Sequence, residues 1–363
     1  DIEITPAQLA LDPCSASAVI TDVHTGEVRA LVTYPSYDNN KFSGTVDAEY
    51  YNKLNNDQSL PLFNNATQAQ KAPGSTFKPI IAVAALEEGV IGLNDTVNCT
   101  GIYKEISPAL RCWIYPGQHG PLDVVHGIQN SCNVFFSEMG HRLSMDENGN
   151  YSPELGIEKI RKYASLFGLD ETSGIEIAER EPQMTTEKPE ASSIGQGKNS
   201  YSNIQLSRYI TAVANKGTVF KLSLLDKMTD SQGNLLEDFP PEVRSVIDVK
   251  DSTWNAVHTG MRRVISDGSA RKIFSDLEVD IAGKTGTAEE IKNGHRINHA
   301  FFVSFAPYQN PEIAVTVNIP YGYSSSNAAT AAKNIYRFYY GYTDLNYILN
   351  NSALNSSNVE IGD

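Results

Sequence analysis

The chain has 363 residues, of which 40% are hydrophobic and 20% charged, and its formal net charge is -14 at pH 7. This composition is ordinary for a globular protein and excludes the disordered and fibrous classes. The 29 lysines and arginines are scattered singly, which argues against nucleic acid or an anionic membrane as the main partner. The sequence starts at Asp1 without an apolar leader, and no apolar stretch reaches about 18 residues, so we expect a trimmed soluble fragment.

Five short runs rich in β-branched and aromatic residues predict strands, two near the start of the chain and three near its end. They are residues 18–23, 28–32, 280–286, 300–305 and 313–318. The turn sequence His24-Thr25-Gly26-Glu27 predicts a hairpin between the first two. The two ends of the chain should therefore share one antiparallel sheet, with helices between them. We expect a single α/β domain over residues 1–345 and a frayed polar tail at 346–363.

Four segments between and after these strands have helical apolar periodicity. They are residues 76–86, 134–143, 152–167 and 327–340. Pro79 is tolerated in a first helical turn, so the first helix should begin at or near Ser75. Ser131 and Asn133 fall on the loop that leads into the second helix. Turn signals in residues 226–251 predict a hairpin excursion rather than a separate domain.

The string Ser75-Thr76-Phe77-Lys78 can supply a nucleophile and its base. A serine hydroxyl must lose its proton to a nearby base as it attacks a carbonyl. Three residues are nearly one helical turn, which places Lys78 beside Ser75. The lysine amine is a base only when neutral, and burial beside another cation, for which Lys284 is a candidate, favours that state. Alone, such a string usually marks a surface helix turn.

Two further strings supply the other parts of an acyl-transfer site. Ser131-Cys132-Asn133 offers a hydroxyl that can relay a proton to a leaving group and an amide that can hold a substrate amide or orient Lys78. In Lys284-Thr285-Gly286-Thr287 the glycine lets a substrate lie along a strand edge, while the ammonium and two hydroxyls can bind a carboxylate. Each string is weak alone, but their occurrence together in this order indicates serine acyl transfer.

The three strings resemble those of penicillin-binding proteins, although Cys132 stands where class A β-lactamases have Asp. More of the chain is similar to the transpeptidase domain of the monofunctional, class B penicillin-binding proteins, over most residues from about 14 to 342. The matching stretches include residues 18–22, 35–38, 172–176 and 194–197. This breadth makes a chance match of short motifs improbable.

The resemblance implies an α/β (α+β) fold of the penicillin-binding-protein and serine β-lactamase type. In that fold a five-stranded antiparallel sheet covered by helices lies beside an all-helical subdomain, with the active site between them. Ser75 would be the acylated nucleophile and Lys78 its base, while Ser131 would pass the proton onward and Asn133 would position the substrate. The carboxylate end of the substrate would be held by the last string, Lys284, Thr285, Gly286 and Thr287. The backbone N–H groups of Ser75 and Thr287 would form the oxyanion hole.

The implied activity is D,D-transpeptidation that crosslinks peptidoglycan. Its partners would be stem peptides, a D-Ala-D-Ala donor and an amine acceptor, and β-lactams would acylate the same serine; no cofactor is required. The resemblance also implies a bacterial, extracytoplasmic protein. Its membrane anchor and non-catalytic pedestal domain would precede the present sequence, and a cell-wall synthesis complex is an expected partner in cell shape or division.

Other activities of the same acylation site stay open at this point. A β-lactamase needs a base for water, and Pro153-Glu154-Leu155-Gly156 superficially resembles the class A string that carries one. We favour a simpler interpretation, in which Ser152 caps a helix and Glu154 complements its dipole. A β-lactam sensor would use the same site to signal a partner, and a D,D-carboxypeptidase would pass the acyl group to water.

The cysteines raise a separate hypothesis, a structural zinc site. Cys112, His119 and Cys132 offer soft thiolate and imidazole ligands, with Cys99 and His126 nearby. Their spacing matches no standard zinc template. Buried free thiols, or a disulfide between Cys99 and Cys112, are the alternatives.

Overall fold

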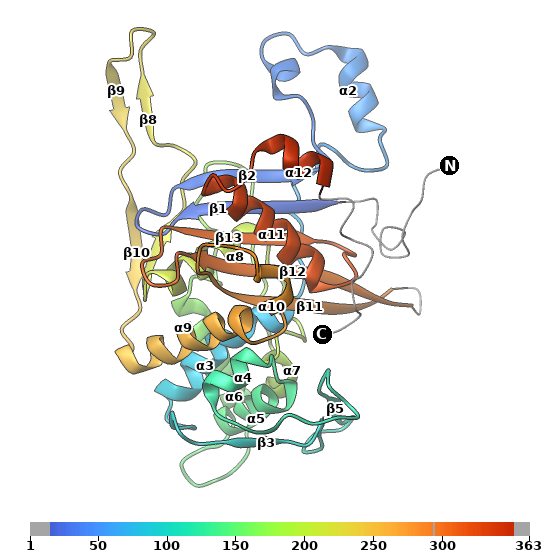
Figure 1. Ribbon diagram of the computed structural model, residues 1–363, viewed down its shortest axis with the longest axis vertical. Helices are drawn as coiled ribbons and strands as arrows, with labels where there is room; N and C mark the ends of the chain where they lie inside the picture. Colours follow the sequence, from blue (N-terminus) through green and yellow to red (C-terminus); the bar gives the residue numbers. More distant parts are fainter. Residues whose placement is uncertain (1–14, 293–294, 352–363) are drawn as a thin grey trace.

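The computed structural model describes residues 15–292 and 295–351, and its centre is a five-stranded antiparallel sheet (Figure 1). In spatial order the strands are β11 (Ala282–Lys292), β12 (His295–Ala306), β13 (Ile313–Ile319), β1 (Ala16–Asp22) and β2 (Val28–Tyr34). The N-terminal hairpin thus joins the three C-terminal strands through the β1–β13 pair, in which Ala18 lies opposite Val317. All five predicted strands and their shared sheet are confirmed.

Two helices cover opposite faces of this sheet (Figure 1). Helix α8 (Asn203–Ala214) packs on one face, where the hydroxyl oxygens of Thr21 in β1 and Thr211 lie 2.6 Å apart. Helix α11 (Ser325–Tyr339) packs on the other, where the hydroxyl oxygens of Ser304 in β12 and Tyr336 lie 2.9 Å apart. Because both faces are covered, β13 is buried along almost its whole length.

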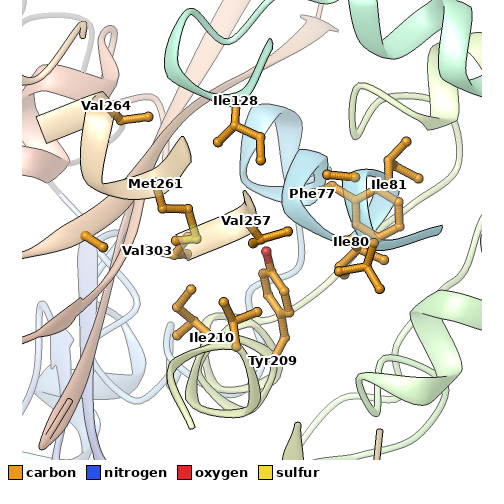
Figure 2. Close-up of a cluster of buried hydrophobic side chains, with 14 of the residues drawn as sticks. Phe77, Ile80, Ile81, Ile128, Tyr209, Ile210, Val257, Met261, Val264 and Val303 are labelled. Atoms are coloured by element: carbon orange, nitrogen blue, oxygen red, sulfur yellow. The ribbon is translucent and has the colours of Figure 1, made fainter. Parts of the chain in front are cut away.

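Helix α3 (Lys78–Glu87) is the buried centre of a second, mainly helical part. Four helices pack around it, namely α4 (Val124–Gln129), α5 (Asn133–Leu143), α6 (Pro153–Leu166) and α9 (Asp251–Ser266). Figure 2 shows Phe77, Ile80 and Ile81 in one cluster with side chains of α4, α8, α9 and the sheet. The larger of the two hydrophobic clusters among the described residues therefore runs from the sheet into the helical part and fixes the start of α3 between them.

The remaining elements are short. The strand pairs are β3 (Val97–Cys99) with β6 (Gly120–Leu122), β4 (Ile102–Tyr103) with β5 (Leu110–Arg111), β7 (Thr218–Lys221) with β10 (Glu242–Val246), and β8 (Lys227–Thr229) with β9 (Leu235–Asp238). The short helices are η1 (Asn39–Phe42), α2 (Ala48–Asn55), η2 (Gly74–Phe77), α7 (Pro189–Ser192) and α10 (Arg271–Phe274). The β8–β9 hairpin projects from the body in Figure 1, which confirms the predicted excursion.

Two sequence predictions need correction. The helix expected from Ser75 is a 3-10 turn at first, because Pro79 has no N–H to donate to the Ser75 carbonyl, and the α-helix begins at Lys78. The tail expected from residue 346 is helical at its start, as α12 (Leu345–Asn351). The Asp344 carboxylate accepts a hydrogen bond from the Tyr347 N–H there (2.7 Å). Residues 352–363 lie outside the described residues.

Candidate active site

The Ser75 side chain stands on a turn that the backbone presses against strand β11. Gly74 has a φ of +54°, and a Cβ added there would lie 2.8 Å from the carbonyl oxygen of Thr287. The Gly74 N–H donates to the Gly195 carbonyl on the other side (3.0 Å). Thr76 and Phe77 are buried, whereas Ser75 is partly exposed. The turn therefore presents this hydroxyl at a surface formed by fixed backbone.

Lys78 brings two of the three strings together. Its side chain is fully buried. Nζ donates to Asn133 Oδ1 (2.7 Å) and the Ser131 carbonyl (2.7 Å), the two donors that a neutral amine has, and lies 3.3 Å from Ser131 Oγ. Residues three apart in a 3-10 turn lie above one another, so Lys78 and Ser75 project from the same side of η2. The structure thus groups the predicted nucleophile, base and relay hydroxyl.

The loop between α4 and α5 holds Ser131 in a rare backbone conformation. Ser131 has a φ of +49°, a region that costs free energy for a residue with a side chain. Cys132 then caps α5, its Sγ accepting a hydrogen bond from the Phe135 N–H (3.4 Å). The Asn133 amide donates to the Arg111 carbonyl (3.2 Å) while its oxygen accepts from Lys78. Asn133 therefore links the buried amine to strand β5.

Strand β11 forms the opposite wall of the site. A Cβ added at Gly286 would lie 2.7 Å from Thr76 Cγ2, so β11 contacts the nucleophile turn directly. Because β11 is at the edge of the sheet, one row of its backbone groups is left unpaired by β12. Lys284 and Thr285 are buried, and Lys284 Nζ donates to the Thr285 carbonyl (3.1 Å). Among the described residues, Thr287 Oγ1 is a buried hydroxyl without a hydrogen-bond partner.

These contacts bring the three strings to one place, as the sequence predicted. Two partners of the site were missed: Ser269, whose hydroxyl lies 3.3 Å from that of Thr285, and Tyr209, whose hydroxyl donates to the Thr76 carbonyl (3.1 Å). Both come from segments without a motif, so no local signal in the sequence points to them. Glu154 lies in the first turn of α6 and accepts a hydrogen bond from the Ser152 hydroxyl (3.1 Å), as the capping interpretation predicted.

A thiol cluster adjoins the Ser131–Asn133 loop. One donor atom from each of four residues lies within 4.8 Å of the other three, and the residues are Cys99, Cys112, His119 and Cys132. The three cysteines are buried and free, so the alternative of a disulfide between Cys99 and Cys112 is wrong. His126 is not in the cluster, since its ring lies against Asp123 and Arg263. The fourth donor is Cys99, which the sequence placed nearby without including it.

The electrostatics of the cluster favour the thiolate form at Cys99 and Cys112 and the thiol form at Cys132. Hydrogen bonding with the Cys132 thiol is the largest cause that lowers the pKa of Cys112 and of Cys99. The same contacts raise the pKa of Cys132. Burial opposes protonation of His119, but hydrogen bonds to Cys112 and Cys99 outweigh it and raise the pKa of the imidazole. His119 Nε2 is buried without a hydrogen-bond partner among the described residues.

The fold and site can now be compared with known proteins. The model of the penicillin binding protein transpeptidase domain matches residues 16–337. The chain belongs to this family. Over 363 aligned positions this transpeptidase domain is 31% identical to the peptidoglycan D,D-transpeptidase MrdA of Haemophilus influenzae, covering 91% of the chain and 53% of that protein. It is 32% identical to MrdA of Escherichia coli, covering 88% of the chain and 53% of the relative.

The domain therefore spans about half the length of these relatives. Among solved structures it is similar to PBP2 of Pseudomonas aeruginosa in complex with WCK 5153, with a TM-score of 0.76 and 28% identity over 93% of this chain and 76% of that one. A peptidoglycan synthase complex contains a chain with a TM-score of 0.79 and 26% identity, covering 91% of this chain and 56% of that one. In the described part of this domain, helices are too short or too polar to cross a membrane.

Proposed function

We propose that this domain is a serine D,D-transpeptidase that crosslinks peptidoglycan stem peptides through an acyl-enzyme on Ser75. The observation that carries the proposal is the buried amine of Lys78, hydrogen-bonded to Asn133 and Ser131 on the side of η2 from which Ser75 projects. The proposal is also supported by the similarity to relatives that are named peptidoglycan D,D-transpeptidases.

In the first half-reaction Ser75 Oγ attacks the carbonyl carbon of the penultimate D-Ala, and its proton moves to a neutral Lys78 amine. The negative charge that develops on the carbonyl oxygen is stabilised by the N–H groups of Ser75 and Thr287, which the close approach of Gly74 to Thr287 brings together. The C–N bond then breaks, and D-Ala leaves with a proton relayed through Ser131. In the second half-reaction an amine of another stem peptide attacks the ester and Ser75 regains its proton.

Strand β11 accounts for the binding of the substrate. A peptide lying along the free edge of β11 can hydrogen-bond to its unpaired backbone groups. Its terminal carboxylate would meet the hydroxyls of Thr285 and Thr287, with the Lys284 charge behind them. The Thr287 hydroxyl, which is buried and has no hydrogen-bond partner in the described part of the chain, is explained if the substrate supplies that partner.

Labelling with a fluorescent penicillin tests the acylation step. The purified chain should take up one label, peptide mapping should place it on Ser75, and Ser75→Ala should abolish labelling without lowering the melting temperature. Ser43→Ala, at an exposed serine in a loop, is the matched control and should label normally. A label at another residue, or unchanged labelling of Ser75→Ala, contradicts the proposal.

The fate of the adduct separates transpeptidation from its alternatives. A penicilloyl adduct that lasts hours is expected, whereas turnover within seconds indicates a β-lactamase. With a stem-peptide donor and an amine acceptor, the crosslinked product should form. Hydrolysis in place of crosslinking indicates a carboxypeptidase, and acylation without turnover of either kind indicates a sensor.

We also propose that the thiol cluster binds a structural zinc ion. Three thiols and one imidazole are the ligand set of a closed, tetrahedral zinc site, and the geometry supports Cys112, His119 and Cys132 with Cys99 as the fourth ligand. The ion would fix the loop that carries Ser131 and Asn133 and takes no part in acyl transfer. No cofactor is proposed for the chemistry itself.

Metal analysis of protein purified without chelator tests the zinc site. We expect one zinc per chain, lost in Cys112→Ser and retained in Cys14→Ser, a cysteine outside the described residues. Substoichiometric zinc in the unaltered protein, with all four of its thiols titratable, contradicts the proposal.

For the whole protein we propose an extracytoplasmic position, membrane anchoring through a segment N-terminal to this domain, and action within a cell-wall synthesis complex. The support is the similarity to a chain of a peptidoglycan synthase complex. In the source bacterium, protease added outside spheroplasts should digest the tagged full-length protein, and crosslinking should recover a peptidoglycan polymerase with it. Protection from the protease contradicts this proposal.

A further inference from the structure

A polar network joins the nucleophile turn to strand β11 beyond the three motifs. Lys71 Nζ donates to Glu290 Oε2 (2.7 Å), and the same oxygen accepts a hydrogen bond from His299 Nε2 (2.8 Å). The Lys71 ammonium also lies 5.3 Å from the centre of the Tyr321 ring. The network thus connects three segments that are distant in the sequence.

Each member is held by its own backbone. Lys71 precedes Ser75 by one short segment, and both its N–H and its carbonyl pair with Tyr201, which is fully buried. Glu290 follows Thr287 on β11, and His299 lies on β12 opposite Ala288, two residues before Glu290, so the two side chains are diagonal neighbours on one face of the sheet. The attraction between the Lys71 and Glu290 side chains therefore draws the nucleophile turn and β11 together.

The His299 side chain is fixed in one tautomer. Its Nδ1 accepts a hydrogen bond from the Tyr321 N–H (3.1 Å), so the proton must be on Nε2, which donates to Glu290. The imidazole is almost fully buried, with 2% of its side chain exposed. The Glu290 carboxylate therefore has a fixed partner on the sheet and a second partner, Lys71, across the gap.

We propose that Lys71, Glu290 and His299 are positioning residues that hold β11 against the nucleophile turn and so set the spacing of the Ser75 and Thr287 backbone N–H groups. This inference rests on the proposed function. The contacts of Gly74 and Gly286 across the same gap are steric, and they set only how closely the nucleophile turn and β11 can approach each other. The Lys71–Glu290 ion pair attracts, so it limits how far they can separate.

The partial exposure of the Lys71–Glu290 ion pair means that its loss should affect acylation and stability differently. The side chains of Lys71 and Glu290 are 23% and 41% exposed, and ion pairs with this exposure contribute little to the free energy of unfolding. In contrast, a displacement of about 1 Å in a catalytic group can slow a reaction about 100-fold. Loss of the pair should therefore slow acylation much more than it destabilises the fold.

The test is the kinetics of acylation by a penicillin in Lys71→Met and Glu290→Ala. We expect each to lower the first-order acylation rate constant about tenfold to 100-fold, with little change in the dissociation constant of the pre-covalent complex or in melting temperature. The double variant should be no slower than the slower single variant, because both remove the same connection. Lys71→Arg should restore most of the rate. Lys162→Met, which removes an exposed ion pair with Glu88, is the matched control and should acylate normally.

Three results would overturn the inference: wild-type rates in both single variants, effects that multiply in the double variant, or losses matched by unfolding and not restored by Arg. If the unaltered protein is not acylated at all, the proposed function fails instead. The two failures are therefore distinguishable in one experiment.

Discussion

The two walls of the active site are held in different ways. The wall formed by η2 and β11 depends mainly on backbone: Gly74 and Gly286 let two segments approach to contact distance, and the register of a buried sheet fixes one of them. The Lys71–Glu290 ion pair adds one side-chain contact between these segments. The wall formed by the α4–α5 loop depends on side chains: Lys78 and the thiol cluster hold Ser131 and Asn133 from either side.

This difference shows which perturbations each wall should resist. Backbone register in a sheet covered on both faces changes only with unfolding, so the β11 wall should tolerate changes of solvent and fail when a side chain is inserted. If the thiol cluster holds zinc as proposed, the loop wall should be sensitive to chelation, because metal binding responds to the free metal concentration. Four predictions follow from this contrast, from the largest effect to the smallest.

Lys78→Met should break the connection between the two walls. Its amine donates to both Ser131 and Asn133, and a general base contributes about 100- to 10,000-fold to a rate. We expect acylation by a penicillin to slow at least about 1,000-fold, measured by single-turnover labelling. Equal labelling rates in Lys78→Met and the unaltered protein contradict the assignment of Lys78 as the base. Lys284→Met should act differently, by weakening the binding of substrates that carry a carboxylate.

Gly286→Ala should damage the backbone wall alone. The added methyl would lie 2.7 Å from Thr76 Cγ2 and push β11 away from the nucleophile turn. We expect acylation to slow about 100-fold, as for removal of one oxyanion donor, while zinc content is unchanged. Gly44→Ala is the control for the acylation rate: no described atom lies within 4 Å of the added methyl, and its φ of +88° confines the strain to an exposed loop. A normal acylation rate in Gly286→Ala would show that the close contact is not needed.

Zinc removal should damage the loop wall alone. Loss of ligands that support a catalytic group typically costs about 10- to 100-fold, and we expect a similar fall in the acylation rate after chelation. Hydrogen exchange should accelerate in residues 97–135 and stay unchanged in β11, β12 and β13. Readdition of zinc should restore both, whereas faster exchange throughout the sheet contradicts the separation of the two walls.

Mild acid should destabilise the fold through His258 on α9. Burial lowers the pKa of this imidazole from its ordinary value of 6.5 to about 4, although its Nε2 donates to the Val213 carbonyl. The folded state thus stays neutral while the unfolded state takes up a proton, so stability is complete above pH 6.5 and is lost as the pH falls toward 4. The difference is about 2 kcal/mol between pH 7.5 and pH 5.

Chemical denaturation at both pH values measures this loss, and His258→Gln should reduce it. His24→Gln, at an exposed histidine, is the control. Equal pH dependence in His258→Gln and the unaltered protein contradicts the role of His258.

The sequence predicted the parts that depend on local pattern. Strands with clear apolar runs, and helix α6 with its Ser152 cap, fall close to their expected bounds. Helix α2 was missed, because it buries only Leu54 among its residues and so has no continuous apolar face. The 3-10 turn at Ser75 arises because Pro79 has no N–H for the Ser75 carbonyl. The spacing of apolar residues does not distinguish a 3-10 turn from the first turn of an α-helix.

For the site, the strings predicted which residues meet but not what holds them. The membership of Cys99 in the thiol cluster depends on the pairing of β3 with β6. The Lys71–Glu290 contact joins positions whose proximity follows from the packing of the nucleophile turn against β11. Neither pairing has a signal in the sequence until the strands are placed.

The position of β1 in the sheet also determines when, during synthesis of the chain, the sheet can fold. Ala18 pairs with Val317, so the two neighbouring strands that are farthest apart in the sequence, β1 and β13, pair inside the sheet and not at its edge. Loops of this length form late and slowly. The edge strand that faces Ser75 cannot be anchored until nearly the whole chain has been synthesised, so an incomplete chain should not acylate, and early exposure to a β-lactam should leave it unmodified.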